Sequence, residues 1–234
     1  MKKYRKNIEQ VKEQIRTDLY NNAPRYKQSI IRKFTGIYKG SENERDFINN
    51  VERTFKLSNT DKGIFVAELE ITKKKIAKLH DDYFSASIKQ TLDQFELDKM
   101  LAAYNVSFDG IEESIKQKMI REFRASVQGG YGVDELRKKL YNSGLGWYQA
   151  ATEANTAIAQ FDNNYHTQTA SAAGINLFLY DGTIYKSRRF CIDHIGNYYT
   201  LEELSNMDNG QGLPVETSCG GYNCVHYLTA KVDD

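Results

Sequence analysis

The sequence is poor in the residues that interrupt helices, with only two prolines, Pro24 and Pro214, among 234 residues. Residues that favour helices, such as lysine, glutamate, glutamine and alanine, are frequent instead. No run approaches the roughly 20 apolar residues that a membrane span requires. No apolar segment follows the basic N-terminus, as one would in a secretory signal. These absences predict a mainly helical protein that neither crosses a membrane nor carries a secretory signal.

Cysteine is also scarce, and the three present, Cys191, Cys219 and Cys224, all lie near the C-terminal end. An odd number of cysteines interleaved with histidines favours a reducing compartment and a metal site over a disulfide framework. The sequence contains no Walker loop, no GxGxxG and no HExxH motif. No residue stands out to orient a cysteine or histidine for catalysis. We therefore predict no catalytic residues and expect that the protein is not an enzyme.

The net charge is close to zero, because the chain has 32 basic and 31 acidic residues. The chain as a whole therefore does not look like a nucleic-acid binder. The distribution is uneven, because residues 1–40 hold 11 basic and 3 acidic side chains. A basic arm of this kind can contact nucleic acid or an acidic protein surface. A solvated helix face is the simpler interpretation, and we prefer it. The candidate contacts of the arm are Lys2, Lys3, Arg5 and Lys6.

Apolar residues spaced three and four apart predict a series of helices. Because the residue before a proline avoids helical geometry, Pro24 should separate the first two helices. Asp109, three residues before Glu112, is expected to cap a helix. The segment 58–82 is partly strand-like, but we interpret most of it as helix. The remaining predicted helices cover 2–22, 24–38, 43–56, 83–104, 109–128, 133–141 and 147–174.

The pattern changes after Gly174, where short extended segments replace helices. An apolar segment, 175–180, precedes Asp181-Gly182, which predicts a tight hairpin with a return strand at 183–185. A further extended piece near 198–199, a capping box from Thr200 to Glu203 and a closing strand at 227–232 are expected. The predicted architecture is a multi-helix body followed by a small α+β domain with a hairpin and a Cys/His knot. Its expected parts are 1–107, with the basic arm, then 108–174 and 175–234.

The C-terminal part carries five residues that could bind zinc. Zinc takes four thiolate or imidazole ligands, and pairs of them usually come from short loops. Gly220-Gly221 would let the backbone turn sharply beside the ion. Two alternatives remain open: buried free cysteines with hydrogen-bonded histidines, or a disulfide between Cys219 and Cys224. The five candidates form the patterns Cys191-x2-His194 and Cys219-x4-Cys224-x-His226.

Four other polar residues have either a functional or a structural interpretation. Arg188 and Arg189 form a basic pair that could clamp a carboxylate or a phosphate. We prefer the alternative that an arginine here bonds across the small domain to fix its loops. His80 and His166 stand alone on predicted helices, so we expect surface positions or internal hydrogen bonds for both.

Several motifs, in this order and spacing, resemble the MuF-type head morphogenesis proteins of tailed phages. The resemblance covers roughly residues 108–230. Two positions depart from the family pattern: Val225 stands where arginine is usual, and Ala151 stands where arginine often precedes Thr-Glu. The matching elements are Gln128-Gly129-Gly130, the small-residue helix Ala151–Ala157, Arg188-Arg189-Phe190-Cys191, the segment His194–Thr200, and the ending Gly220-Gly221-Tyr222-Asn223-Cys224-Val225-His226.

The resemblance implies a structural minor head protein, present in several copies per virion. Its partners would be the portal protein, the major capsid protein or both, and packaged DNA is a further candidate. It would reside in the head interior or at the portal vertex, after assembly in the host cytoplasm. The Cys/His knot would then hold a structural zinc. The alternatives are a metal-dependent hydrolase or nuclease, or a zinc-containing nucleic-acid-binding module, built on the C-terminal part.

Overall fold

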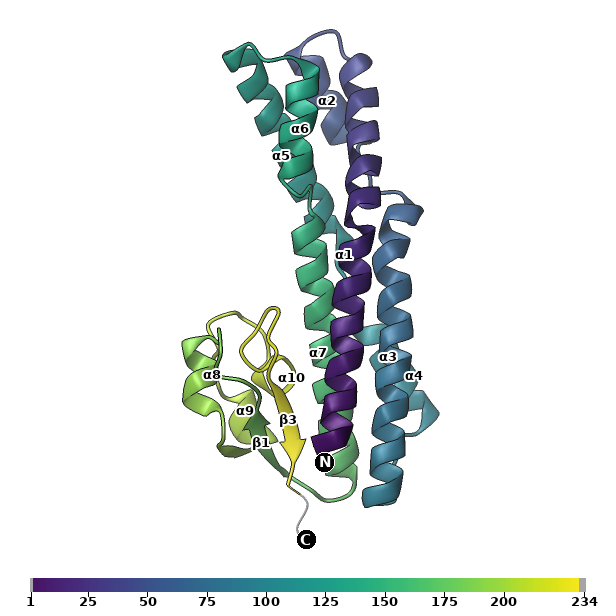
Figure 1. Cartoon of the computed structure of the whole chain (residues 1–234), viewed down its shortest axis with the longest axis vertical. Helices are drawn as coiled ribbons and strands as arrows, with labels where there is room; N and C mark the ends of the chain where they lie inside the picture. The colour runs from purple at the N-terminus through teal and green to yellow at the C-terminus, as the bar shows by residue number, and fades with distance from the viewer. Residues whose placement is uncertain (1, 232–234) are drawn as a thin grey trace. The chain divides into compact units, whose positions relative to one another are not determined.

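The computed structural model describes residues 2–231, with the Lys2 side chain outside that description. Helices occupy most of this length, and a small antiparallel sheet follows them (Figure 1). The predicted class, mainly helical with a small α+β part, is confirmed. The elements are α1 (Lys2–Lys39), α2 (Glu44–Thr54), α3 (Asn59–Ser87), α4 (Gln94–Ala103), α5 (Phe108–Gly129), α6 (Val133–Asn142), α7 (Trp147–Ala172), β1 (Leu177–Asp181), α8 (Arg189–His194), β2 (Tyr198–Thr200), α9 (Leu201–Ser205), α10 (Val215–Ser218) and β3 (Tyr227–Ala230).

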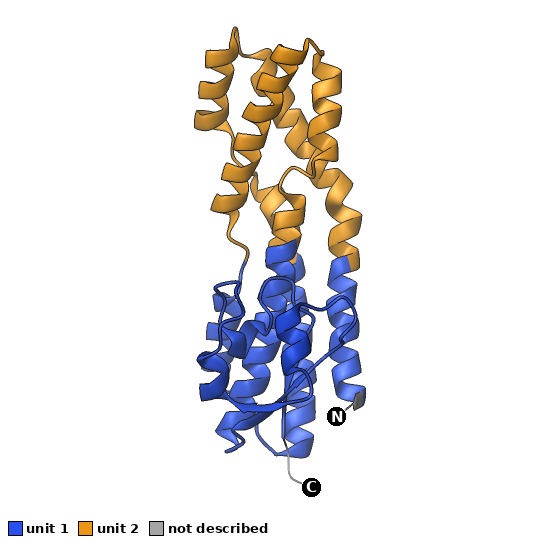
Figure 2. Ribbon diagram, turned by 90° about the vertical axis from the view of Figure 1, so that its left-hand side faces the viewer, with its two compact units in different colours: residues 1–16, 68–105, 152–234 blue, residues 17–67, 106–151 orange. Residues whose placement is uncertain are grey.

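The chain divides into two compact units, and each unit combines segments that are distant in the sequence (Figure 2). Unit 1 consists of Met1–Arg16, Glu68–Asn105 and Thr152–Asp234, and unit 2 of Thr17–Ala67 and Val106–Ala151. All five candidate metal ligands therefore belong to unit 1. Among the described residues, no helix combines the length and the apolar character that a membrane crossing needs.

Aromatic side chains fill the core of unit 2. Helix α2 begins at Asn43, whose side chain accepts a hydrogen bond from the Asp46 backbone N–H. Its buried Phe47 stacks on Phe123 of α5 with ring centroids 4.1 Å apart. Phe34 of α1 meets Phe47 edge-on at 5.8 Å. Such contacts between aromatic rings stabilise the unit beyond the area they bury.

Helix α1 runs without a break through Pro24, so the prediction of two helices separated there was wrong. A proline inside a helix costs about 3 kcal/mol because it removes a backbone hydrogen bond and crowds the preceding turn. The buried positions Leu19, Ala23, Tyr26 and Ile30 keep helical spacing across the proline. Packing of this stripe offsets the local cost, and the helix continues.

Two further local predictions were wrong. The predicted helix 83–104 is interrupted, because α3 ends at Ser87 and α4 begins only after Asp93, which caps it. Asp109 lies within the first turn of α5, and Ser107 occupies the capping position. The strand-like segment 67–71 is helical within α3, as we interpreted it.

The sheet has the strand order β2-β1-β3, and both pairings are antiparallel. The predicted return strand at 183–185 does not form, and β1 pairs instead with two strands from later in the chain. The predicted closing strand is confirmed as β3, with Val232 outside the described residues. The capping box from Thr200 to Glu203 is also confirmed.

The sheet packs against the helices of unit 1 through one continuous apolar core. Phe84 of α3 and Ala170 of α7 contribute to this core from the helical side. The three cysteines, all free, belong to the same cluster. The remaining members of the cluster are Phe178, Tyr180, Leu204, Val215, Leu228 and Ala230.

Candidate metal centre

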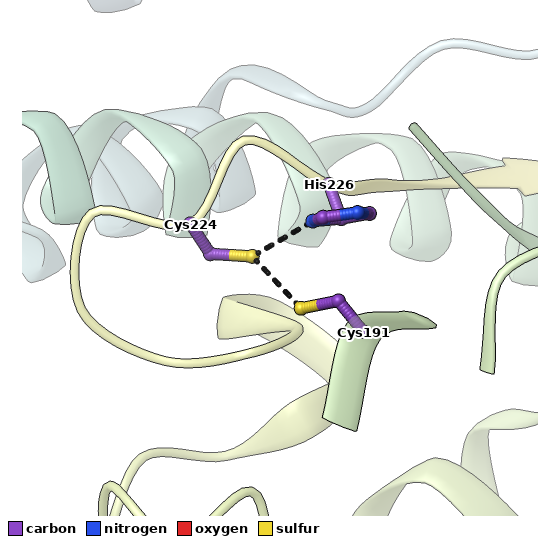
Figure 3. Close-up of side chains that lie close together, drawn as sticks. All are labelled: Cys191, Cys224 and His226. Atoms are coloured by element: carbon purple, nitrogen blue, oxygen red, sulfur yellow. Dashed lines mark hydrogen bonds between the residues drawn. The ribbon is translucent and has the colours of Figure 1, made fainter. Parts of the chain in front are cut away.

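Three side chains from separate elements converge at one point of unit 1 (Figure 3). Cys191 extends from α8, Cys224 from a loop, and His226 from the residue just before β3. The two sulfurs lie 3.7 Å apart, and the Cys224 Sγ lies 3.3 Å from the His226 Nδ1. The three donor atoms all lie within 4.8 Å of one another, and all three residues are buried. The cluster could therefore hold a metal ion.

Glycines shape the backbone around this cluster. A Cβ at Gly220 would collide with the Cys191 sulfur. Without one, the Gly220 N–H reaches the Cys224 sulfur at 3.3 Å. Gly182 has φ +147°, and a Cβ there would lie 2.6 Å from the His226 ring. Gly220 and Gly182 therefore both require glycine. For Gly220, this agrees with the sharp turn beside the ion that the sequence predicts.

Hydrogen bonding separates the two cluster thiols into different protonation states. The bond from the Cys191 thiol lowers the pKa of Cys224, and the bond with His226 lowers it further, in opposition to burial. The same bond with Cys224, together with burial, raises the pKa of Cys191. The pair thus shares one proton and places a thiolate at Cys224. A thiolate is the form of cysteine that binds metals.

The orientation of His226 is fixed by its second ring nitrogen. The Nε2 atom lies 2.9 Å from the Thr183 carbonyl oxygen, which can only accept, so Nε2 must donate. The Nδ1 atom faces the Cys224 sulfur, and a proton or a metal ion can lie between these two atoms. A backbone carbonyl that holds the outer nitrogen of a histidine is the usual support of a metal ligand.

The other two candidate ligands lie apart from this cluster. Cys219 is fully buried and accepts a long hydrogen bond from the Asn163 amide at 3.5 Å. Burial raises the pKa of Cys219, so its thiol stays protonated. His194 is bonded through Nδ1 to the Tyr199 hydroxyl at 2.8 Å. The described residues hold no disulfide, because all three cysteines are free.

A cavity of about 510 Å³ adjoins the cluster. Cys191, Cys224 and His226 form part of its wall, so the space between the three donor atoms is reached from this side. None of the lining residues, all of which the structure describes, is an aspartate or a glutamate. The rest of the wall comprises Thr183, Tyr185, Lys186, Ser187, Arg188, Asn223 and Val225.

The two arginines of the basic pair behave differently. Arg188 donates to the carbonyl oxygens of Gly220, at 3.2 Å, and of Tyr222, at 2.6 Å. These bonds fix the loop that carries Cys224, as the preferred interpretation expects. Arg189 is exposed and pairs with Asp193 at 2.9 Å on the same helix.

The basic arm forms the first turns of α1. Lys3 and Lys6 are exposed, whereas the Lys2 side chain lies outside the described residues. Arg5 is buried and points inward, so its guanidinium is not available to a partner in solution. The sequence predicted Arg5 as a partner contact together with the neighbouring lysines, because charge alone does not show which face of a helix is buried.

Sequence reasoning missed a buried polar network centred on Asp162 of α7. Its carboxylate contacts Arg5 at 3.0 Å, Lys12 at 2.5 Å and the His80 Nε2 at 2.9 Å. Burial would raise the pKa of Asp162, but Lys12 and Arg5 outweigh it and hold this pKa well below its usual range. Asp162 falls on the same helix face as the apolar residues 158, 161 and 165, which is the one sequence signal that marks it as buried.

Hydrogen bonds fix the tautomers of the two histidines of the network. The Ala230 N–H donates to the His166 Nε2 at 2.9 Å, so the proton of this ring is on Nδ1, which faces the Tyr4 hydroxyl at 3.2 Å. Tyr4 can then donate to the Nδ1 of His80, whose Nε2 donates to Asp162. Burial lowers the pKa of both His80 and His166. Both histidines thus have the internal hydrogen bonds that we expected as one alternative.

Comparison of the chain with protein-family models, with curated proteins and with solved structures finds no match. The features that bear on function are therefore the geometry of unit 1 and the motifs in the sequence.

Proposed function

We propose that this protein is a structural minor head protein of a tailed phage, acting in head morphogenesis at or near the portal. The observation that carries the proposal is that the side chains of Cys191, Cys224 and His226 converge on one buried point. These residues stand at the positions by which the C-terminal part resembles MuF-type proteins. A chance likeness of short motifs gives no reason for residues 33 positions apart to converge on one buried point.

We propose further that the cluster binds zinc. Bonds of about 2.3 Å to sulfur and about 2.0 Å to nitrogen, at tetrahedral angles, separate two sulfurs by about 3.8 Å and sulfur from nitrogen by about 3.5 Å. The separations of 3.7 Å and 3.3 Å are close to these values. When bound, zinc would crosslink α8 to the loop and strand that follow. A small sheet buries little apolar surface, so such a crosslink would contribute substantially to its stability.

The partners in this proposal are the portal protein, the major capsid protein or both, with packaged DNA as a further candidate. The exposed Lys3 and Lys6 remain available for a contact with DNA. The exposed Ile184 and Tyr185, at 66% and 73%, offer apolar area for a protein contact. The chain would be located in the head interior or at the portal vertex.

The direct test is to locate the chain in purified virions and to ask whether it co-purifies with the portal ring. We expect a fixed, small number of copies per virion and retention on the portal in moderate salt. Replacement of Ile184 and Tyr185 by serine should weaken retention, whereas replacement of the exposed Phe95 of α4 should not. Absence of the chain from virions that carry its gene would contradict the proposal.

One observation favours a second candidate, a metal-dependent hydrolase or nuclease. Catalytic zinc sites have three protein ligands and an open position, and here three ligands border a cavity. However, the described lining of the cavity has no carboxylate that could act as a general base. We therefore assign no catalytic residues. Cleavage of DNA or RNA that is lost in a folded Cys224→Ala variant would establish this second candidate in place of the first.

A further inference from the structure

The candidate metal centre supplies three donors where zinc takes four. A structural zinc site is normally closed by a fourth protein ligand, and the chain offers two nearby candidates. The Cys219 sulfur accepts a hydrogen bond from the Asn163 amide, and His194 is bonded to Tyr199. Neither residue joins the three donor atoms. The side that remains open faces the cavity of about 510 Å³.

Charge in the cavity indicates which kind of ligand fits there. Two thiolates neutralise a zinc ion, so the centre itself would carry no net charge. The wall adds the ammonium of Lys186 and the guanidinium of Arg188, with no described acidic side chain to offset them. A cavity bordered by cations concentrates anions. Its volume lies within the range of small-molecule sites in proteins, which is about 300–1,000 Å³.

We infer that the metal centre is open, and that its fourth position takes the anionic group of a small molecule, a carboxylate or a thiolate, which enters through the cavity beside Lys186 and Arg188. This inference rests on the metal of the proposed function. It goes further, because it assigns to the centre a binding activity in addition to its stabilising role. Arg188 orders the loop, whereas Lys186 is exposed and lines the cavity, so Lys186 is the residue that would attract the anion.

The test uses the full-length protein loaded with cobalt(II), whose visible spectrum reports the ligands of the metal. One cobalt per chain is expected, with charge-transfer absorption from two thiolates. Addition of azide, as a small anionic probe, should change the spectrum in a saturable way, and imidazole, as a neutral probe, should do the same. Cys219→Ser should leave the spectrum unchanged, whereas Cys224→Ser should remove about half of the thiolate absorption.

Lys186→Gln provides the test of the anionic preference, because this exposed residue can change without disturbing the core. Loss of one nearby cation at an exposed site has a small effect, so the azide dissociation constant should rise about 1.4- to fivefold. The imidazole dissociation constant should not change. An equal effect on both probes, or an effect on neither, would overturn the preference for anions.

Other outcomes separate this inference from the proposed function. A cobalt spectrum that responds to neither probe, and that loses one third of its thiolate absorption in Cys219→Ser, would mean that Cys219 closes the site. That result overturns the inference but retains the metal. If Cys219→Ser does not fold, X-ray absorption of the zinc-loaded protein can count the sulfur ligands. Two sulfurs are expected, and three would contradict the inference. Failure to bind any metal would overturn both proposals.

Discussion

Unit 1 contains two buried polar clusters, and only the one around Cys224 borders the cavity described above. Around Asp162, the carboxylate and both imidazoles have partners within the protein, although the Arg5 Nε has none. Around Cys224, three donor atoms lie close together and one side borders the cavity. A buried hydrogen-bonded network contributes rigidity and specificity to a fold. A cluster that borders a cavity can take up a further atom, and this difference distinguishes a candidate binding site from a structural cluster.

The largest expected effect follows from removal of the central charge of the Asp162 cluster. Asp162→Asn leaves the buried Arg5 without its counter-charge, and leaves the buried Lys12 with Glu9 alone. Removal of one partner of a buried ion pair costs about 3–5 kcal/mol, and denaturant unfolding should show a loss of this size. The matched control is Asp134→Asn, because Asp134 pairs with Arg137 at an exposed site and should be dispensable. Similar stabilities for the two variants would show that the Asp162 cluster is hydrated.

The second effect is a loss of stability in mild acid. The lowered pKa values of His80 and His166 mean that only the unfolded chain takes up protons on these residues below about pH 6.5. The free energy of unfolding should therefore fall as the pH decreases from about 6.5 to 5, by about 1.4 kcal/mol per pH unit for each histidine at most. The low pKa of Asp162 adds a separate loss that begins only below about pH 4.

Unfolding curves at a series of pH values provide the measurement for this second effect. His166→Asn should reduce the slope between pH 6.5 and 5 by about half, since it removes one of the two buried imidazoles. A slope that is the same in the variant and in the unchanged protein would show that His166 does not remain neutral in the folded state.

The third effect concerns the Cys224 cluster. A ligand present at 100 times its dissociation constant stabilises a protein by about 2.7 kcal/mol, so removal of zinc with a chelator should lower the melting temperature measurably. Cys224→Ser should be insensitive to the chelator, and Asp162→Asn should retain full sensitivity. A chelator effect that persists in Cys224→Ser would place the metal elsewhere.

The smallest effects distinguish the two neighbouring arginines. Arg188→Ala removes hydrogen bonds to two backbone carbonyls of the cysteine loop and should cost about 1 kcal/mol, with a matching decrease in metal affinity. Arg189→Ala removes only an exposed pair with Asp193, and its effect should stay within about 0.5 kcal/mol. Comparison of zinc affinities for the two variants checks whether the loop contact supports the cluster.

The sequence predicted elements wherever a local pattern determines the structure. Helical spacing identified most of the helices, and the chemistry of Thr200 and Glu203 identified a capping box that forms. Long-range contacts decided the elements that were missed. Pro24 was expected to end a helix, but the buried stripe on either side continues the helix through it.

The candidate site was predicted in part, for the same reason. Spacing alone made five residues equal candidates for a metal, whereas three-dimensional position separates Cys191, Cys224 and His226 from the other two. The network around Asp162 was not predicted, because its members lie far apart in the sequence and helical spacing alone does not show that their side chains meet. Only the three-dimensional structure shows that the residues of this network are buried together.

The contact of Arg5 with the Leu228 carbonyl has a consequence for how the protein is made. The two residues are 223 positions apart, so this bond forms only after nearly all of the intervening chain has left the ribosome. Until then, the first turns of α1 carry Tyr4, Arg5 and Ile8 without the surfaces that bury them. Synthesis of β3 is therefore the step that completes unit 1, and a nascent chain stalled before residue 228 should expose the start of α1 to proteases and chaperones.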